Sequence, residues 1–251
     1  MHVEPAQLCS AEPLPEVMQA AQAVAGGKPL GRCLIYAPDA IGTQLLPRFP
    51  KEIAVARRFA PLQVELDSVL PTVTPVCFAS MFTGAPPALH GIQTYARPRL
   101  ICDTLFDALA RSGKRVAIVA VRNSSIDIIF RGRAIDYFTE DYDPQVTQRT
   151  LALLQQDQHD FILAYHQEYD DLLHKSTPFS DEALAAVRRH LASFAELAAA
   201  ADQYWAGHSR MVACCPDHGA HIDPVTGRGT HGSALPADMQ VSHFLGIAAP
   251  N

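Results

Sequence analysis

The sequence predicts an α/β fold, in which a mostly parallel central sheet is covered by helices on both faces. Two observations lead to this fold class: short apolar runs recur along the 251 residues, and segments with helical periodicity lie between them. Such alternation is typical of parallel sheets, whose strands are hidden on both faces. Because 48% of the residues are hydrophobic, one sizeable core is available, and we expect a single domain over residues 1–251.

The expected elements follow in chain order. Residues 1–30 are rich in Pro, Ala and Gly and are expected to form a helix and a connector. Strands are expected at 32–38 (RCLIYAP), 115–121 (RVAIVAV), 161–166 (FILAYH) and 210–216 (RMVACCP). A helix is predicted over 101–114, where Gly113 suits the C-terminal cap, and another over 180–206, where Ser180 suits the N-cap and acidic residues follow.

Composition excludes several classes of partner. The formal net charge is −6 and no basic run occurs, which argues against a protein that binds nucleic-acid polymers through their phosphates. No stretch approaches the roughly 20 apolar residues that span a bilayer, and the N-terminus lacks a secretory signal pattern. The six cysteines show no CxxC spacing and are expected to be reduced. We therefore expect a cytoplasmic protein without a membrane partner; its oligomeric state is left open.

Acidic and imidazole side chains follow three of the four predicted strands. They are Asp39 after the first, Asp170 and His174 after the third, and Asp217 and His218 after the fourth, with His231 shortly downstream. Taken singly, such an Asp is often a helix cap, and an Asp/His pair four residues apart is often a solvated helix face. The carboxyl ends of parallel strands meet at one edge of the sheet, however, where ligands bind. We therefore expect these six side chains to share one crevice.

Six such side chains in one crevice indicate a metal centre. Three carboxylates would repel one another unless a cation neutralised them, and carboxylate with imidazole suits Zn²⁺ or Mn²⁺. Six ligands are too many for one tetrahedral zinc, but they suit two metals about 3.5–4 Å apart, as in phosphoryl transfer. A hydroxyl bound to one metal would lose its proton at little cost and become a nucleophile.

The segment 71–92, PTVTPVCFASMFTGAPPALHGI, supplies such a hydroxyl. It resembles the nucleophile segment of the type I phosphodiesterase/nucleotide pyrophosphatase family of the alkaline phosphatase superfamily, where P-T-x-T precedes S-x-x-T-G-x-x-P-x-x-H-G. The second threonine of this motif is the family's nucleophile and falls on Thr74. An Asp after the first strand, a D-x-x-x-H pair, a D-H-G at 217–219 and an H-G at 231–232 follow in the family's arrangement. The resemblance extends from about residue 32 to about residue 246.

The resemblance implies an alkaline phosphatase-like fold and a metal-dependent phosphoesterase, of the phosphodiesterase/nucleotide pyrophosphatase type, acting on a small phosphorylated substrate. It assigns Asp170, His174 and His231 to one divalent metal. Asp39, Asp217 and His218 are assigned to the other, with Thr74 alongside. Zn²⁺ is the first choice of metal and Mn²⁺ the second.

Two departures from the family pattern affect the substrate. The family's Asn three residues after the nucleophile, which holds a phosphoryl oxygen, is Cys77 here, and a thiol is a weak donor. Arg122, directly after the strand 115–121, is the best substitute by position, although a surface Arg at a strand end explains it equally well. Only a dozen residues separate His218 from His231, so we expect a minimal version of the fold without a large cap.

These departures keep two alternatives open. The first alternative is a phosphonate or phosphomonoester hydrolase of the same superfamily. The second is a non-catalytic relative that binds metal or a phosphorylated ligand. An intact Thr74 beside a complete ligand set favours the enzyme, because a binding module has no need of a nucleophile.

Overall fold

A seven-stranded sheet forms the centre of the computed structural model, which describes residues 3–26 and 28–251. Its strands are β1 (Arg32–Pro38), β2 (Leu62–Asp67), β3 (Val116–Val121), β4 (Asp136–Glu140), β5 (Phe161–His166), β6 (Arg210–Cys214) and β9 (Gln240–Ala248). They lie in the order β2-β9-β6-β1-β5-β3-β4. β1 pairs in parallel with β5 and β6, and β3 with β4 and β5, whereas β9 is antiparallel to β2 and β6. The predicted, mostly parallel sheet is confirmed.

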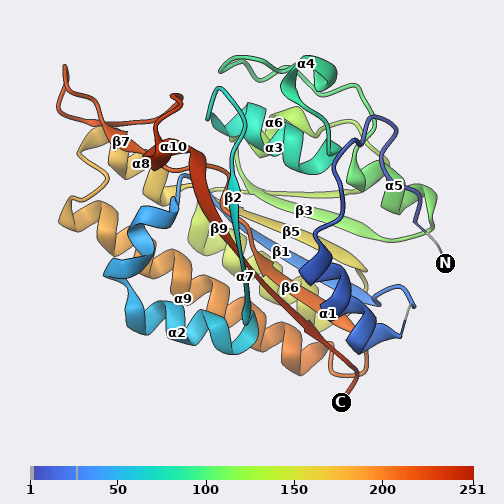
Figure 1. Cartoon of the computed structure of the whole chain (residues 1–251). Coiled ribbons are helices and arrows are strands. Elements are labelled where there is room, and N and C mark those ends of the chain that lie inside the picture. The colour runs from blue at the N-terminus through green and yellow to red at the C-terminus, as the bar shows by residue number, and fades with distance from the viewer. Residues whose placement is uncertain (1–2, 27) are drawn as a thin grey trace.

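Helices cover both faces of this sheet (Figure 1). They are α1 (Pro15–Ala25), the 3₁₀ helix η1 (Thr43–Arg48), α2 (Pro50–Phe59), α3 (Thr74–Thr83), α4 (Pro87–His90), α5 (Leu105–Arg111), α6 (Ser125–Ile129), α7 (Asp143–Gln156), α8 (Glu168–Lys175), α9 (Asp181–Tyr204) and α10 (Pro236–Met239). One core lies between the sheet and α2, α7, α8 and α9, and a second between the sheet and α3, α5 and α6. The expected arrangement of a central sheet with helices on both faces is therefore present.

The predicted elements match with small shifts. All four expected strands occur, and α1 lies within the expected N-terminal helix and connector. The hydroxyl of Ser180 accepts a hydrogen bond from Ala183 N at the start of α9. The helix expected at 101–114 begins only at Leu105, because Thr104 and Asp107 form a capping box there, and Gly113 follows its C-cap with φ +73°.

Three strands of the sheet escaped the sequence analysis. β2 and β4 are its edges, and every residue of β4 is only half-buried, so neither shows a continuous apolar run. In β9 Ser242, His243 and Gly246 interrupt the apolar pattern. The short hairpin of β7 (His221–Ile222) and β8 (Gly229–Thr230) was also missed. Edge strands therefore carry a weaker sequence signal than buried ones.

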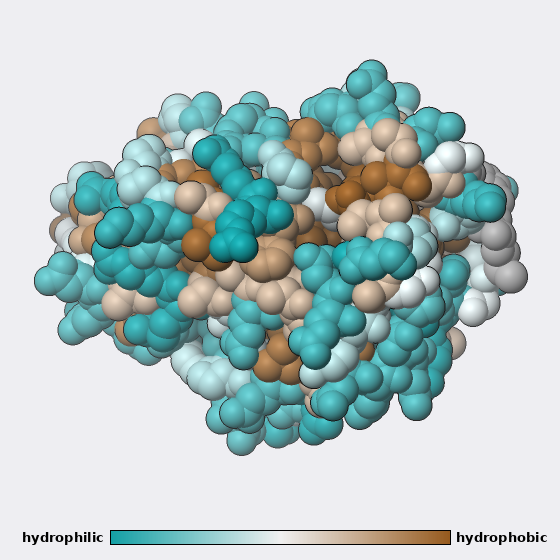
Figure 2. Space-filling view, turned by 90° about the horizontal axis from the view of Figure 1, so that it is seen from below, coloured by the Kyte–Doolittle hydropathy of each residue, from teal (hydrophilic) through white to brown (hydrophobic). Residues whose placement is uncertain are grey.

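A helix that crosses a bilayer must be both long and apolar. Figure 2 shows hydrophilic residues around the rim of one face, with hydrophobic residues visible nearer its middle. Within residues 3–26 and 28–251, no helix combines the length and the apolar character needed to cross a bilayer.

Candidate active site

Three adjacent strands in the middle of the sheet deliver the acidic and imidazole side chains. β6, β1 and β5 are neighbours, and their carboxyl ends point to the same edge. Asp39 directly follows β1, Asp217 and His218 follow β6, and α8 begins soon after β5. His231 comes from the segment after β8. The crevice expected from the sequence therefore lies beyond the carboxyl ends of the three central strands.

The structure gathers six side chains into two sets, each with ligand atoms within 4.8 Å of one another. We name them by burial. The outer set is Asp170, His174 and His231, in which the His174 side chain is 43% exposed. The inner set is Asp39, Asp217 and His218, all at most 2% exposed. The two sets adjoin, because the rings of His218 and His231 stack with centroids 4.1 Å apart.

The spacing of the ligand atoms within each set suits a metal ion. In the outer set, Asp170 Oδ1 lies 3.3 Å from the Nε2 atoms of His174 and His231, which are 3.1 Å apart. In the inner set, His218 Nε2 lies 3.5 Å from Asp39 Oδ1 and 3.4 Å from Asp217 Oδ2. Ligands about 2.0–2.1 Å from a tetrahedral zinc lie about 3.4 Å from one another. Both sets therefore have the dimensions of a metal site.

Each histidine is fixed with the same nitrogen facing its set. Nδ1 of His174 donates to Gly229 O at 3.1 Å, that of His218 to Gly219 O at 3.0 Å, and that of His231 to Thr72 O at 2.8 Å. Since a carbonyl oxygen only accepts, Nδ1 carries a proton, and in the neutral imidazole Nε2 then presents a lone pair. Such a second hydrogen bond is the usual support of a metal-ligating histidine.

Several buried atoms of these sets lack a hydrogen-bond partner. Within the described chain they include Asp170 Oδ1, Asp217 Oδ2 and His218 Nε2. Unpaired buried polar atoms are costly, and a cation bound within each set would accept their lone pairs. The residues present therefore fit two divalent metal ions.

The electrostatics of the site lead to the same fit. Burial, followed by the charges of Asp217 and Asp170, raises the pKa of Asp39 well above its usual range. Burial, followed by the charge of His231, lowers the pKa of His218 to about 3, so its imidazole is neutral at pH 7. Repelling carboxylates beside a neutral imidazole are stabilised most effectively by a bound cation.

Thr74 lies against the inner set. It is the first residue of α3, is only 4% exposed, and its hydroxyl donates to the Asp39 carboxylate, with Oγ1 3.2 and 3.3 Å from the two oxygens. Thr74 therefore presents a buried hydroxyl at the N-terminus of α3, in contact with the inner set.

Residues 39–221 match the family model described as type I phosphodiesterase/nucleotide pyrophosphatase. The chain belongs to this family. No curated protein sequence gives a significant match. The matched segment covers Thr74 and both Asp residues of the inner set, but ends before His231.

Solved structures share the fold of this phosphodiesterase-family chain. Phosphonoacetate hydrolase from Sinorhizobium meliloti 1021, in complex with phosphonoformate, is 20% identical with a TM-score of 0.59, over 76% of this chain and 57% of that one. Murine ectonucleotide pyrophosphatase/phosphodiesterase 5 is 16% identical with a TM-score of 0.60, over 76% and 58%. A 2-O GAG sulfatase is 12% identical with a TM-score of 0.62, over 88% and 65%. The chain thus spans less than two thirds of these proteins.

Two groups of the phosphodiesterase-family site were missed by the sequence analysis. The hydroxyl of Tyr165, in β5, donates to Asp39 Oδ2, and the backbone N–H of Ala40 donates to Asp217 Oδ1 at 3.2 Å. Tyr165 was read as an apolar strand residue, and a backbone donor leaves no trace in sequence. Each restrains one carboxylate, leaving its other oxygen directed at the site.

Gly219, the last residue of the D-H-G motif, allows a close backbone approach. A Cβ there would lie 2.0 Å from the carbonyl oxygen of Ala237 and 3.0 Å from Cα of Gly42. We expect Gly219→Ala to displace the segment that carries Asp217 and His218, to destabilise the fold by about 1–3 kcal/mol, and to weaken the binding of any divalent metal by these side chains. Thermal unfolding and elemental analysis measure both effects.

Gly207→Ala is the matched control for this substitution, because a Cβ at Gly207 would meet nothing within 4 Å. Unchanged metal binding in Gly219→Ala would contradict the prediction that this glycine keeps Asp217 and His218 in position.

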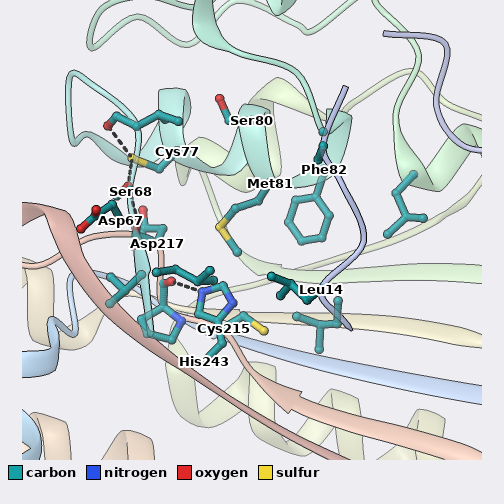
Figure 3. A pocket seen from close by; sticks show the side chains of 18 of the residues that line it. Leu14, Asp67, Ser68, Cys77, Ser80, Met81, Phe82, Cys215, Asp217 and His243 are labelled. Atoms are coloured by element: carbon teal, nitrogen blue, oxygen red, sulfur yellow. Dashed lines mark hydrogen bonds between the residues drawn. The ribbon is translucent and has the colours of Figure 1, made fainter. Parts of the chain in front are cut away.

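Cys77 and Arg122 do not join the two sets in the structure. Ser68 Oγ lies 3.1 Å from Cys77 Sγ and 2.7 Å from the carbonyl oxygen of Asp217. Figure 3 shows Ser68, Cys77 and Asp217 together at one end of a cavity of about 490 Å³, with Met81 along its wall. Arg122 instead pairs with Asp141 at 3.2 Å on the surface. Contacts of Cys77 or Arg122 with a substrate stay predictions.

Proposed function

We propose that the protein is a two-metal phosphoesterase of the phosphodiesterase/nucleotide pyrophosphatase type, acting on a small phosphorylated substrate. Zn²⁺ is the metal we favour, with Mn²⁺ as the alternative. The main support is that two adjoining sets contain buried ligand atoms without hydrogen-bond partners, and that the Thr74 hydroxyl lies beside the inner set. Family membership supports the same reaction class.

The proposed residue roles follow from the contacts. Asp170, His174 and His231 would hold one ion, and Asp39, Asp217 and His218 the other. Bound there, the ions would neutralise phosphoryl charge and stabilise the attacking and leaving oxygens.

Thr74 carries the covalent step of the proposal. Its hydroxyl already donates towards Asp39, which orients an Oγ lone pair away from that carboxylate. Oγ gives up its proton and forms a bond to phosphorus while the bond from phosphorus to the leaving oxygen breaks, and the leaving oxygen takes up a proton. Water then attacks phosphorus and the Oγ–P bond breaks. One proton of the water restores the Thr74 hydroxyl, and the product departs as a phosphate monoester when the substrate is a diester.

A phosphonate or phosphomonoester hydrolase is the second candidate, because the family's Asn is Cys77 here and Arg122 would have to supply the missing donor. The ion pair of Arg122 with Asp141 involves side chains that are 56% and 81% exposed. Exposed pairs of this kind contribute little, about 0–1 kcal/mol, so binding of the guanidinium to a phosphoryl group instead would cost little. A guanidinium gains more from a dianion than from the single charge of a diester.

We expect Arg122→Ala to lose activity, by more on an aryl monoester or phosphonoacetate than on a bis-aryl diester, with Cys77→Asn nearly neutral. The reason is that Arg122, rather than residue 77, would supply the missing oxyanion donor. Steady-state kinetics on the three substrates measure the difference.

Asp141→Ala is the control, since it removes the partner of Arg122 and keeps the guanidinium. Unchanged kinetics in Arg122→Ala, together with a gain of diesterase activity in Cys77→Asn, would contradict this role of Arg122.

The proposed function is tested with metal-replete protein. Elemental analysis should find two Zn²⁺ or Mn²⁺ per chain, and one of the three substrate types should be hydrolysed. Two bound metals without turnover of any of them would favour the non-catalytic relative, and absence of bound metal would contradict the proposal.

A further inference from the structure

Three groups of Asp and His side chains in the described chain are close enough to hold a metal. Two are the outer and inner sets. The third, here called the support cluster, consists of Asp143, His166 and His190, each at most 5% exposed. We infer that Asp143 and His190 are positioning residues, which hold helix α8 and thereby the outer-set ligands. This inference rests on the proposed function.

The ring nitrogens of the support cluster have hydrogen-bond partners in neighbouring residues, unlike several ligand atoms of the two sets. Tyr169 N–H donates to His190 Nε2 at 3.1 Å, so the proton of His190 is on Nδ1, which donates to the Tyr36 hydroxyl at 2.9 Å. That hydroxyl then donates to His166 Nδ1 at 3.0 Å, and His166 Nε2 donates to the Thr147 hydroxyl at 3.2 Å. None of these ring nitrogens is left without a partner. The cluster therefore has no lone pair waiting for a metal.

What the support cluster does contact is the first turn of α8. The N-cap of α8, Gln167, makes no side-chain capping bond. Instead, the two carboxylate oxygens of Asp143 accept from Gln167 N and Glu168 N, both at 3.0 Å, and His190 Nε2 accepts from Tyr169 N. Three consecutive N–H groups, which a helix cannot satisfy itself, are thus bound by side chains from α7 and α9.

The position of α8 decides the geometry of the outer set. Asp170 directly follows Tyr169, and His174 lies one turn further along. With eight residues, α8 is too short to be stable without such contacts. Ligand atoms must be held within about 0.5 Å of their working positions, so a shift of this turn weakens the outer site. None of the inner-set residues belongs to α8, because Asp39 follows β1 and Asp217 and His218 follow β6.

The test measures metal affinity at each site by calorimetric titration of metal-free protein with Zn²⁺. An Asp217→Asn background leaves the outer set complete, and an Asp170→Asn background leaves the inner set complete. We expect Asp143→Ala to weaken zinc binding in the first background by roughly 10–100-fold, the range for supporting residues of metal ligands. In the second background it should change little.

A conservative pair at His190 provides a finer readout. In His190→Gln the side-chain oxygen reaches the place of Nε2 and can still accept from Tyr169 N, whereas in His190→Asn the polar group reaches only the place of Nδ1. Outer-site affinity should therefore survive in His190→Gln and fall in His190→Asn. If Asp143→Ala does not fold, the comparison of His190→Gln with His190→Asn tests the inference by itself.

Thr104→Ala is the matched control, since it removes the cap of α5, a helix without ligands. Equal weakening at both sites, a loss no greater than in Thr104→Ala, or equal affinities of the His190 variants would overturn the inference. A third zinc lost in both His190 variants would overturn it too, by making the cluster a metal site. Wild-type protein that binds no zinc would instead contradict the proposed function.

Discussion

Thr74→Ala is expected to lower turnover by on the order of 10⁶-fold, the cost of removing the nucleophile from a serine hydrolase. The substitution deletes the hydroxyl that lies 3.2 Å from Asp39 and leaves all six charged or imidazole side chains of the two sets in place. Bound metal and thermal unfolding should therefore stay near wild type. Rapid-quench detection of a phosphorylated chain, present in wild type and absent in the variant, completes the measurement.

Thr72→Ala serves as the comparison for Thr74→Ala. Thr72 also lies in the nucleophile segment, but its hydroxyl accepts from Gly232 N at 2.9 Å rather than facing the carboxylates. We expect a mild effect there. Unchanged turnover in Thr74→Ala would show that water, not Thr74, attacks phosphorus directly.

Asp217→Asn should reduce the bound metal from two ions to one and lower turnover by more than the roughly 10- to 100-fold cost of changes outside the ligand shell. Asp217 Oδ1 accepts from Ala40 N at 3.2 Å, whereas Oδ2 is buried without a partner. An asparagine would keep its oxygen on Ala40 N and turn its NH₂ group towards the metal position. An amide nitrogen with two protons offers no lone pair to a cation.

Metal-free protein separates this explanation from simple misfolding. Burial first, and then repulsion among the neighbouring carboxylates, raises the pKa values of Asp217 and Asp39 and makes their charged forms unfavourable without metal. Metal-free Asp217→Asn should therefore unfold at a higher temperature than metal-free wild type. Wild type should in turn gain more stability from added Zn²⁺. A variant that is less stable than wild type without metal, or that still binds two ions, would contradict the role of Asp217.

How well sequence predicts this site depends on where each residue lies along the chain. Asp39, Asp217 and His218 come after apolar runs, and such runs are the strongest signal of a buried parallel strand. Because those strands proved to be neighbours, their carboxyl ends place the side chains together. His231 has no strand of this kind before it, and only the resemblance to the family linked it to Asp170.

The residues that support the site could not be predicted from the sequence. Asp143 starts a helix far from its targets in the chain, and His190 lies inside the long α9, where a single polar residue resembles many others. Their function depends on the packing of α7 and α9 around α8, which no local pattern records. Arg122 does follow a strand, β3, as the sequence predicted. Its ion pair with Asp141, which lies after the neighbouring strand β4, could not be predicted from sequence alone.

The unequal exposure of the two sets has a kinetic consequence. His174 is reachable from solvent, with 43% of its side chain exposed, whereas the inner-set residues are at most 2% exposed. An ion in the outer set would exchange readily with the medium while the chain stays folded. An ion in the inner set would exchange more slowly, because its release would require local opening of the segments that hold its ligands.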